Sequence, residues 1–352
     1  MAVDYARIAR DIAFTLEVKS PKIFENIFLN NGCLFMFGSK GRVNIIAGGN
    51  RFDERTRLGK NTNVGHRAKT ATIPTDYQNN VQTAYYGQSV VSGATVVNMV
   101  EEDQNAGPAR ISSLADDCLD ELLNTFPNEV GDKIMATSES GTSPLSLVVQ
   151  LPATAYGSQT ITTGGIVRSD YPGSDPTAAW QTRYSSPATA VDLAAAAGIA
   201  AFSNFLWTCS PGGSAITEQP DLALCRTGVM SQASGGGDVN RRYSVNDKML
   251  KFNFDNIMFN SATLIADRNA VANAILCVNT NYAHIQVLGS GKTKQAKNVK
   301  VIGDGAVSVP LRISQPVESF DALQYSIKAW LTYNLTFGGL RQHGRLANVT
   351  EA

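Results

Sequence analysis

The segment GSGKT at 289–293 is the pattern in this chain that comes nearest to a ligand-binding motif. A nucleotide-binding phosphate loop has the pattern G-x-x-x-x-G-K-[ST], in which successive backbone N–H groups surround the phosphates. The first glycine of that pattern would stand at position 286, which is Gln286, and the KQAKNVK that follows lacks the apolar face of an anion-binding helix. We therefore interpret 289–293 as a basic surface loop that binds no nucleotide. The four lysines of 292–300 would suit nucleic acid or an acidic neighbour equally well.

Histidine, cysteine and serine patterns indicate no other catalytic or metal site. His66, His284 and His343 are not spaced as H-x-x-x-H or H-E-x-x-H, and no G-x-S-x-G sequence marks a nucleophile. A Ser-His-Asp or Cys-His site stays open, because the members of a triad lie far apart in sequence. The five cysteines are widely spaced without C-x-x-C, which is typical of reduced, buried thiols made in a cytoplasm. We expect no catalytic residue, no metal ion and no cofactor.

Two segments of opposite net charge could contact each other. Residues 51–69 hold six positive and two negative side chains, which gives +4, and residues 109–133 carry −4. Four acids of the second segment are spaced so that like charges repel along a helix. We predict that the two segments are electrostatic partners between subunits; the alternative is a solvated helix face. The predicted contact residues are Arg51, Arg55, Arg57, Lys60, Arg67, Lys69, Asp116, Asp117, Asp120 and Glu121.

The composition excludes several classes of protein. The chain has 352 residues, of which 43% are hydrophobic, and a formal net charge of zero, which excludes disorder and argues against a dedicated polyanion binder. Its length predicts two domains or one elaborate domain. Charged residues make up 17%, below the roughly 25% of soluble domains, which hints that partners cover much of the surface. No stretch reaches the roughly 18 apolar residues of a membrane-spanning helix, and the N-terminus does not read as a signal peptide.

Hydrophobic periodicity predicts the elements that position these residues. Helices are expected near 8–16, 21–28, 108–126 and 191–206. Strands are expected at 43–47, 145–151, 221–225, 249–254 and 274–278. The helix that begins at Pro108 should end near Phe126, because Pro127 cannot continue it without a kink.

Two extended segments stand out from this pattern. Residues 50–83 are polar and long for a loop, and loops of such length are usually functional or disordered. Residues 323–337 alternate apolar and polar side chains over fifteen positions, against about 5–6 in a usual strand. A strand of that length spans roughly 50 Å at ~3.3 Å per residue. Few compact enzymes need such a strand, whereas an elongated, wedge-shaped subunit does.

The order of these parts resembles the major capsid protein of tailed bacteriophages, which has the Hong Kong 97-type fold. The likeness covers most of the chain and rests on the ordered series of segments rather than on one motif. These segments are NAGPARISSL before the acidic helix, GGIVRS at 164–169, Trp180-Gln181, PDLALC, KFNFDNIMFNSATLIAD at 251–267, AILCVNTNYAHIQV and YNLTFGGLRQHGRLANV.

The resemblance implies an α+β, Hong Kong 97-like fold with five parts. These are an N-terminal arm at 1–48, an extended loop (E-loop) at 49–98, a peripheral domain at 99–150 and 288–337, an axial α/β domain at 151–287 and a C-terminal tail at 338–352. The peripheral domain would hold the spine helix, about 108–126, and the long strand at 323–337.

The resemblance also implies partners and a location. Subunits would form pentamers and hexamers that close an icosahedral shell around double-stranded DNA, bound without sequence specificity, with a portal protein at one vertex. Scaffolding and decoration or cement proteins are further candidate partners, and no membrane is expected. The shell would be the virion head, assembled in the bacterial host cytoplasm. Two alternatives stay open: an encapsulin-type compartment on the same fold, and a nucleotide-binding hydrolase that uses the 289–293 loop.

Overall fold

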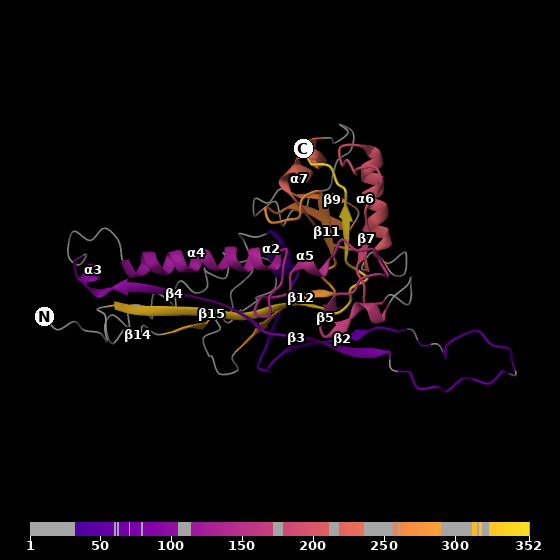
Figure 1. The fold of residues 1–352 in the computed structure, drawn as a ribbon, viewed down its shortest axis with the longest axis horizontal. Helices are drawn as coiled ribbons and strands as arrows, with labels where there is room; N and C mark the ends of the chain where they lie inside the picture. Colours follow the sequence, from indigo (N-terminus) through magenta and orange to yellow (C-terminus); the bar gives the residue numbers. More distant parts are fainter. Residues whose placement is uncertain are drawn as a thin grey trace.

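The computed structural model describes most of the chain beyond the first thirty-one residues. The described residues are 32–59, 61, 63–69, 71–78, 80–104, 114–171, 179–210, 218–235, 256–259, 261–289, 312–314, 317–318 and 324–351. The helices expected near 8–16 and 21–28, the strand at 249–254 and the 290–293 part of GSGKT lie outside these residues. A long sheet with one long helix runs along the molecule, a second sheet stands at one end, and a hairpin projects beyond both (Figure 1).

The long sheet is built on β15 (Gln324–Phe337), the fourteen-residue strand that confirms the predicted long strand. It pairs antiparallel with β4 (Ser89–Asn98) over the whole length of β4. Its other edge pairs with β12 (Ala283–Leu288), β13 (Arg312–Ile313) and β14 (Val317–Glu318), and β1 (Val43–Ile46) joins β12 in parallel. Alternate β15 side chains are buried as far as Tyr333, as period-two alternation requires, and every residue from Tyr333 to Phe337 is buried.

The long helix α4 (Leu114–Ile134) lies along this sheet and continues beyond the predicted end. Pro127 does not end the helix, although a proline in a helix interior removes a hydrogen bond and costs about 3 kcal/mol or more. Phe126, Val130 and Ile134 are all buried, and burying such side chains contributes about 1.5–3 kcal/mol each, which offsets that cost. A short helix, α3 (Met99–Gln104), follows β4.

Strand β4 and helix α4 approach closely at a glycine. A Cβ atom at Gly93 would lie 2.6 Å from Leu122 Cδ1 and 3.1 Å from Phe126 Cε2. A Cβ atom at position 93 would force the Leu122 side chain to move, so Gly93 allows the helix to approach the sheet closely.

The segment 50–83 forms a hairpin rather than an irregular loop. Strand β2 (Phe52–Arg57) pairs antiparallel with β3 (Val81–Tyr86), in register from Phe52↔Tyr86 to Arg57↔Val81. The chain between the two strands extends away from both sheets (Figure 1). The hairpin base is anchored by buried Phe52, Ala84 and Tyr86.

The second sheet has the strand order β7 (Arg183–Ser185), β16 (Gly344–Ala347), β11 (Ala274–Val278), β8 (Leu222–Cys225), β10 (Ala262–Ala266) and β9 (Asn256–Phe259). The strands expected at 221–225 and 274–278 are present as β8 and β11. The segment 338–352, expected as a tail, supplies β16 to this sheet, between β7 and β11. Helices α6 (Ala196–Thr208) and α7 (Thr227–Gly235) pack with it.

Helix α6 begins later than the expected 191, because the residues before it make other contacts. Val191 forms a bridge with Val349, and the Asp192 carboxylate accepts a hydrogen bond from the Ala194 backbone N–H at 2.8 Å.

The strand expected at 145–151 is instead the short helix α5 (Leu147–Gln150). Ser146 caps this helix by accepting a hydrogen bond from the Val148 N–H at 3.1 Å. The β-branched, apolar run was misread because burial inside the protein, and not strand pairing, accounts for its composition. Helix α2 (Gly32–Ser39), strands β5 (Thr162–Thr163) and β6 (Ile166–Val167) and the 3-10 turn η1 (Arg168–Asp170) complete the elements used below.

The cysteines are all free thiols in the described part of the chain. Cys118 is half-buried, and the other free cysteines, Cys33, Cys209, Cys225 and Cys277, are buried. Among the described residues, no helix is both long and apolar enough to cross a bilayer.

Candidate functional site

The hairpin presents basic side chains to solvent. The exposed members of the predicted set are Arg51, Arg55, Arg57, Arg67 and Lys69, and Lys60 lies outside the described residues. Arg51 pairs with Asp53 at 3.1 Å and stacks 3.8 Å from the centroid of the Tyr85 ring. Arg67 donates from Nη2 to the Asn63 carbonyl at 2.8 Å. The hairpin therefore keeps a positive, accessible surface.

The predicted acidic partner lies on α4, away from the projecting hairpin of the same chain (Figure 1). Asp117 and Glu121 have exposed side chains. Asp116 and Asp120 lie in the same helix, with side chains outside the described part. One chain does not bring the two charged segments together, so any contact between them must join two copies.

A half-buried carboxylate joins the hairpin base to the long sheet. Glu54 on β2 accepts hydrogen bonds from Gln286 Nε2 on β12 and from Thr336 Oγ1 on β15, the latter at 3.3 Å. His284 Nδ1 lies 3.5 Å from the same Oε1 atom. Burial alone would raise the pKa of Glu54, but the hydrogen bonds and the charge of His284 outweigh it, so the pKa lies below its ordinary 4.5. Sequence reasoning missed this cluster, because Gln286 and Thr336 lie 232 and 282 residues after Glu54 in the chain.

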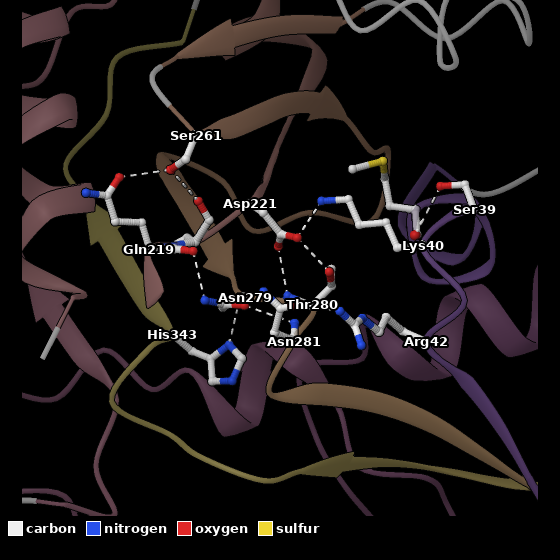
Figure 2. Close-up of polar contacts among 12 residues, drawn as sticks. Ser39, Lys40, Arg42, Gln219, Asp221, Ser261, Asn279, Thr280, Asn281 and His343 are labelled. Carbon is white, nitrogen blue, oxygen red and sulfur yellow. Dashed lines mark hydrogen bonds and ion pairs between the residues drawn. The ribbon is translucent and has the colours of Figure 1, made fainter. Parts of the chain in front are cut away.

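A second polar cluster fixes the connection between the two sheets (Figure 2). Residues 279–282 lead from β11 in the second sheet to β12 in the long sheet. Asp221, next to β8, accepts hydrogen bonds from the Thr280 N–H at 2.8 Å and from Thr280 Oγ1 at 2.6 Å. It also forms an ion pair with Lys40, just after α2. The Asp221 carboxylate therefore joins its own segment to two others, the 279–282 connection and the end of α2.

His343 completes this cluster from the loop between β15 and β16. Its Nδ1 atom accepts a hydrogen bond from the Asn279 N–H at 3.0 Å, and Asn279 Nδ2 donates to the Gln219 carbonyl at 2.8 Å. The ring packs edge to face on Phe337, with centroids 5.3 Å apart. Burial lowers the pKa of His343 from 6.5 to about 3, so the imidazole is neutral at physiological pH. Asn279 lies 64 residues before His343 and 60 residues after Gln219, and no sequence pattern indicated these pairs.

The GSGKT segment begins beside strand β1 of the long sheet. Gly289 donates its N–H to the Ile46 carbonyl at 2.8 Å, and the rest of GSGKT lies outside the described residues. A shallow hollow of about 330 Å³ on β4 and β15, beside Trp330, contains Lys328 as its one titratable group. The described residues contain no group of three or more His, Cys, Asp or Glu side chains that could hold a metal ion.

Comparison with known proteins identifies the fold. No protein-family model and no curated protein matches the sequence. The structure is similar to the cyanophage A-1(L) capsid asymmetric unit, with a TM-score of 0.63, 13% identity, and coverage of 88% of this chain and 91% of the other. It is also similar to the capsid of a native GTA particle, with a TM-score of 0.57, 9% identity, and coverage of 88% and 89%.

A third similar structure is the holo-SrpI encapsulin complex of Synechococcus elongatus PCC 7942, with a TM-score of 0.50, 12% identity, and coverage of 87% and 85%. The chain thus has the α+β fold of tailed-phage major capsid proteins, the Hong Kong 97-type fold. The expected fold class is confirmed.

Proposed function

We propose that this chain is a major capsid protein that assembles as pentamers and hexamers into an icosahedral shell around phage double-stranded DNA. The observation that carries the proposal is the match of fold over 88% of the chain with a cyanophage capsid subunit. The similar proteins of this fold are shell components, and we infer that this chain is a structural protein and not an enzyme.

The hairpin supports this proposal on physical grounds. Val64, Ile73 and Tyr77, beyond the paired strands, are 74%, 69% and 93% exposed. Apolar side chains gain about 25 cal/mol per Å² when they leave water, and the projecting hairpin has no core of its own to bury them. A neighbouring subunit under the hairpin would cover them. In the proposed shell, residues 51–69 therefore pack on a neighbour.

Assembly tests the proposal directly. The full chain, alone and with its scaffolding protein if one exists, should give closed shells by negative-stain microscopy and light scattering. Deletion of residues 52–68 should leave soluble subunits or capsomers that make no stable shell. Only monomers or dimers from the intact chain would contradict the proposal, and normal heat-stable shells from the deletion would contradict the role of the hairpin.

We further propose that the basic hairpin surface and the acidic face of α4 are partners between subunits. Arg55→Glu with Arg57→Glu should impair assembly, and Asp116→Arg with Asp120→Arg should restore part of it. Each exposed ion pair contributes only ~0.2–1 kcal/mol, but a shell repeats it in every subunit. The effect should weaken with salt, because the Debye length falls from ~10 Å at 0.1 M to ~3 Å at 1 M.

A charge-preserving pair of substitutions provides the matched control. Arg55→Lys with Arg57→Lys should assemble like the unmodified chain, since the net charge is unchanged. If the charge-reversed hairpin assembles normally at low salt, or if the double reversal gives no rescue, the pairing is wrong. Asp117 and Glu121, whose side chains are exposed, are the next positions at which to seek rescue.

An encapsulin-type compartment is the second candidate, favoured by the similarity to the SrpI encapsulin shell. Purified shells decide between the two: DNA with a portal vertex supports a phage head, and an enclosed enzyme supports a compartment. A hydrolase that uses the 289–293 loop is the third candidate. It predicts binding heat with ATP that Lys292→Ala abolishes, and we expect neither.

The proposed shell determines the other proposed partners. A portal protein would occupy one vertex, and scaffolding and decoration or cement proteins would act during or after assembly. DNA would contact the inner surface without sequence specificity. The protein would be part of the virion head, assembled in the bacterial host cytoplasm.

A further inference from the structure

The segments GGIVRS and Trp180-Gln181, prominent in the sequence, form one buried cluster around Arg168. Arg168 has no exposed surface. Its Nε donates to Thr163 Oγ1 at 3.0 Å, its Nη1 to Gln159 Oε1 at 2.7 Å, and its Nη2 to the Gln150 carbonyl and Oε1 at 2.8 and 2.9 Å. All these acceptors are neutral. The guanidinium therefore joins α5, the loop before β5, and β5 through directional hydrogen bonds.

Trp180 and Gln181 also donate hydrogen bonds to β5 and to the residues that follow β6. Trp180 Nε1 donates to the Thr163 carbonyl at 3.2 Å. Gln181 Nε2 donates to the Arg168 carbonyl at 3.0 Å and to the Tyr171 carbonyl at 2.7 Å. Both ends of the β5–β6 hairpin are thus fixed by buried hydrogen bonds.

The turn between β5 and β6 touches the projecting hairpin. Gly164 has a φ of +59°, and its carbonyl accepts a hydrogen bond from the Tyr85 N–H on β3 at 2.8 Å. A Cβ atom at Gly164 would lie 2.7 Å from Ala84 Cβ and 2.9 Å from Tyr86 Cζ. Tyr86 in turn donates its hydroxyl to the Phe337 carbonyl at the end of β15, at 2.7 Å. The β5–β6 turn therefore contacts the hairpin base, and the hairpin base in turn contacts the long sheet.

The cluster also reaches the second sheet. Gln159 Nε2 donates to the Thr182 carbonyl at 2.7 Å, and its Oε1 accepts from the Thr182 N–H at 3.1 Å. The next residue, Arg183, begins β7 and donates its N–H to the His343 carbonyl at 2.8 Å. One set of buried hydrogen bonds thus runs from the second sheet to the hairpin.

We propose that the Arg168 cluster is a positioning device that holds the projecting hairpin at a fixed orientation relative to the second sheet, with Arg168 and Gly164 as its positioning residues. A buried charge among neutral groups stabilises a fold less than apolar packing of the same volume. Directional bonds, however, constrain orientation more tightly than apolar contact does. The Arg168 cluster is therefore better suited to fixing the orientation of the hairpin than to adding stability to the fold.

Two adjacent glycines allow a matched test. Gly165 also has a positive φ, +75°, but its added Cβ would meet only Tyr85 Cδ2, at an ordinary 3.9 Å. Gly164→Ala and Gly165→Ala therefore add similar backbone strain, and only the first pushes against β3. We expect Gly164→Ala to raise the hydrogen-exchange rate of the Tyr85 amide about tenfold or more over Gly165→Ala.

A second substitution provides rescue if Gly164→Ala folds poorly. Ala84→Gly removes the Cβ atom that lies nearest, so the Gly164→Ala, Ala84→Gly double variant should regain part of the lost protection. Arg168→Met should release the turn and raise exchange at Tyr85 while the second sheet keeps its protected amides. Equal exchange in the two glycine variants, or unchanged exchange at Tyr85 in Arg168→Met, would overturn the proposal.

The shell assay connects this inference to the proposed function. One expectation rests on the proposed function: Gly164→Ala should give fewer normal shells than Gly165→Ala, and more misshapen ones. If the unmodified chain makes no shells, the proposed function fails, whereas exchange at Tyr85 still decides the positioning role. If shells form and the exchange rates of the two variants match, the positioning role fails alone.

Discussion

Acid should destabilise the folded subunit through His343. The imidazole is fully buried and neutral, and burial lowers its pKa from 6.5 to about 3. Among the groups that act on it, the charge of Asp221 raises the pKa, and those of Arg168 and His284 lower it. A base whose pKa is depressed by folding stabilises the fold above its unfolded pKa. That stability is lost as the pH falls from about 6.5 toward 3.

The size of this effect follows from the pKa difference. The full difference corresponds to an upper limit of about 5 kcal/mol. Between pH 7 and pH 5, most unfolded chains gain a proton at this position and folded chains do not, which removes about 2 kcal/mol of unfolding free energy. Total stabilities are about 5–15 kcal/mol, so the loss should be easy to detect.

Urea unfolding of unassembled subunits at pH 7 and pH 5 measures the effect. His343→Gln keeps an acceptor for the Asn279 N–H but has no titratable group, so the loss between the two pH values should shrink by about 2 kcal/mol. His66→Gln is the matched control, because His66 is exposed, and its pH dependence should equal that of the unmodified chain. The same loss in His343→Gln as in the unmodified chain would refute the reasoning, as would an NMR titration of His343 with a midpoint above pH 6.

Three further predictions concern packing, charge and thiol reactivity. Gly93→Ala should lower the unfolding free energy by about 1–3 kcal/mol in urea, because the new Cβ meets Leu122, whereas Gly65→Ala, with no atom within 4 Å, should change it little. Glu54→Gln should lower stability at pH 7 and reduce the further loss on acidification to pH 3, since a carboxylate with a lowered pKa stabilises the fold only while ionised; unchanged pH dependence would contradict this. Iodoacetamide should label Cys118 first in the native protein, because the other thiols are buried; equal labelling of all five by mass spectrometry would contradict it.

The sequence was a good guide where the signal is local. The alternation of 323–337 is a property of consecutive residues, so it predicted β15 nearly to the residue. Strands β8 and β11 are short apolar runs between turn residues and were found for the same reason. The predicted helix end near Pro127 was wrong, because that prediction considered only the local effect of proline. Burial of Phe126 before the proline and of Val130 after it stabilises the continuous helix.

The buried polar clusters could not be predicted in this way. Glu54 and Arg168 appear in the sequence as ordinary charged residues, and Glu54 stands within the basic segment 51–69, which was predicted to contact another subunit. The partners of Glu54 lie on the distant strands β12 and β15. Those of Arg168 lie nearer in the sequence, on α5, the loop before β5 and β5 itself, but no sequence pattern marks them as its partners. GGIVRS, which contains Arg168, was one of the segments that carried the family resemblance, but the resemblance implied no role for this side chain. The resemblance implied an extended hairpin before the acidic helix, but the residues alone did not indicate the pairing of β2 with β3, because polar strands lack a hydrophobic period.

The two buried bases at the junction of the sheets should respond to acid in a definite order. Arg168 is held among neutral acceptors as a cation, and burial lowers its pKa only to about 10, so acidification leaves its charge and its bonds unchanged. His343 is held as a neutral acceptor, and a proton on Nδ1 removes the acceptor of the Asn279 N–H. Near pH 3, where folded His343 takes up this proton, the Asn279 amide should therefore lose exchange protection while the Tyr85 amide, anchored to Gly164 through the Arg168 cluster, keeps it. Equal loss of protection at both amides would mean that the sheet connection and the hairpin anchor open together, and that the two clusters are one unit.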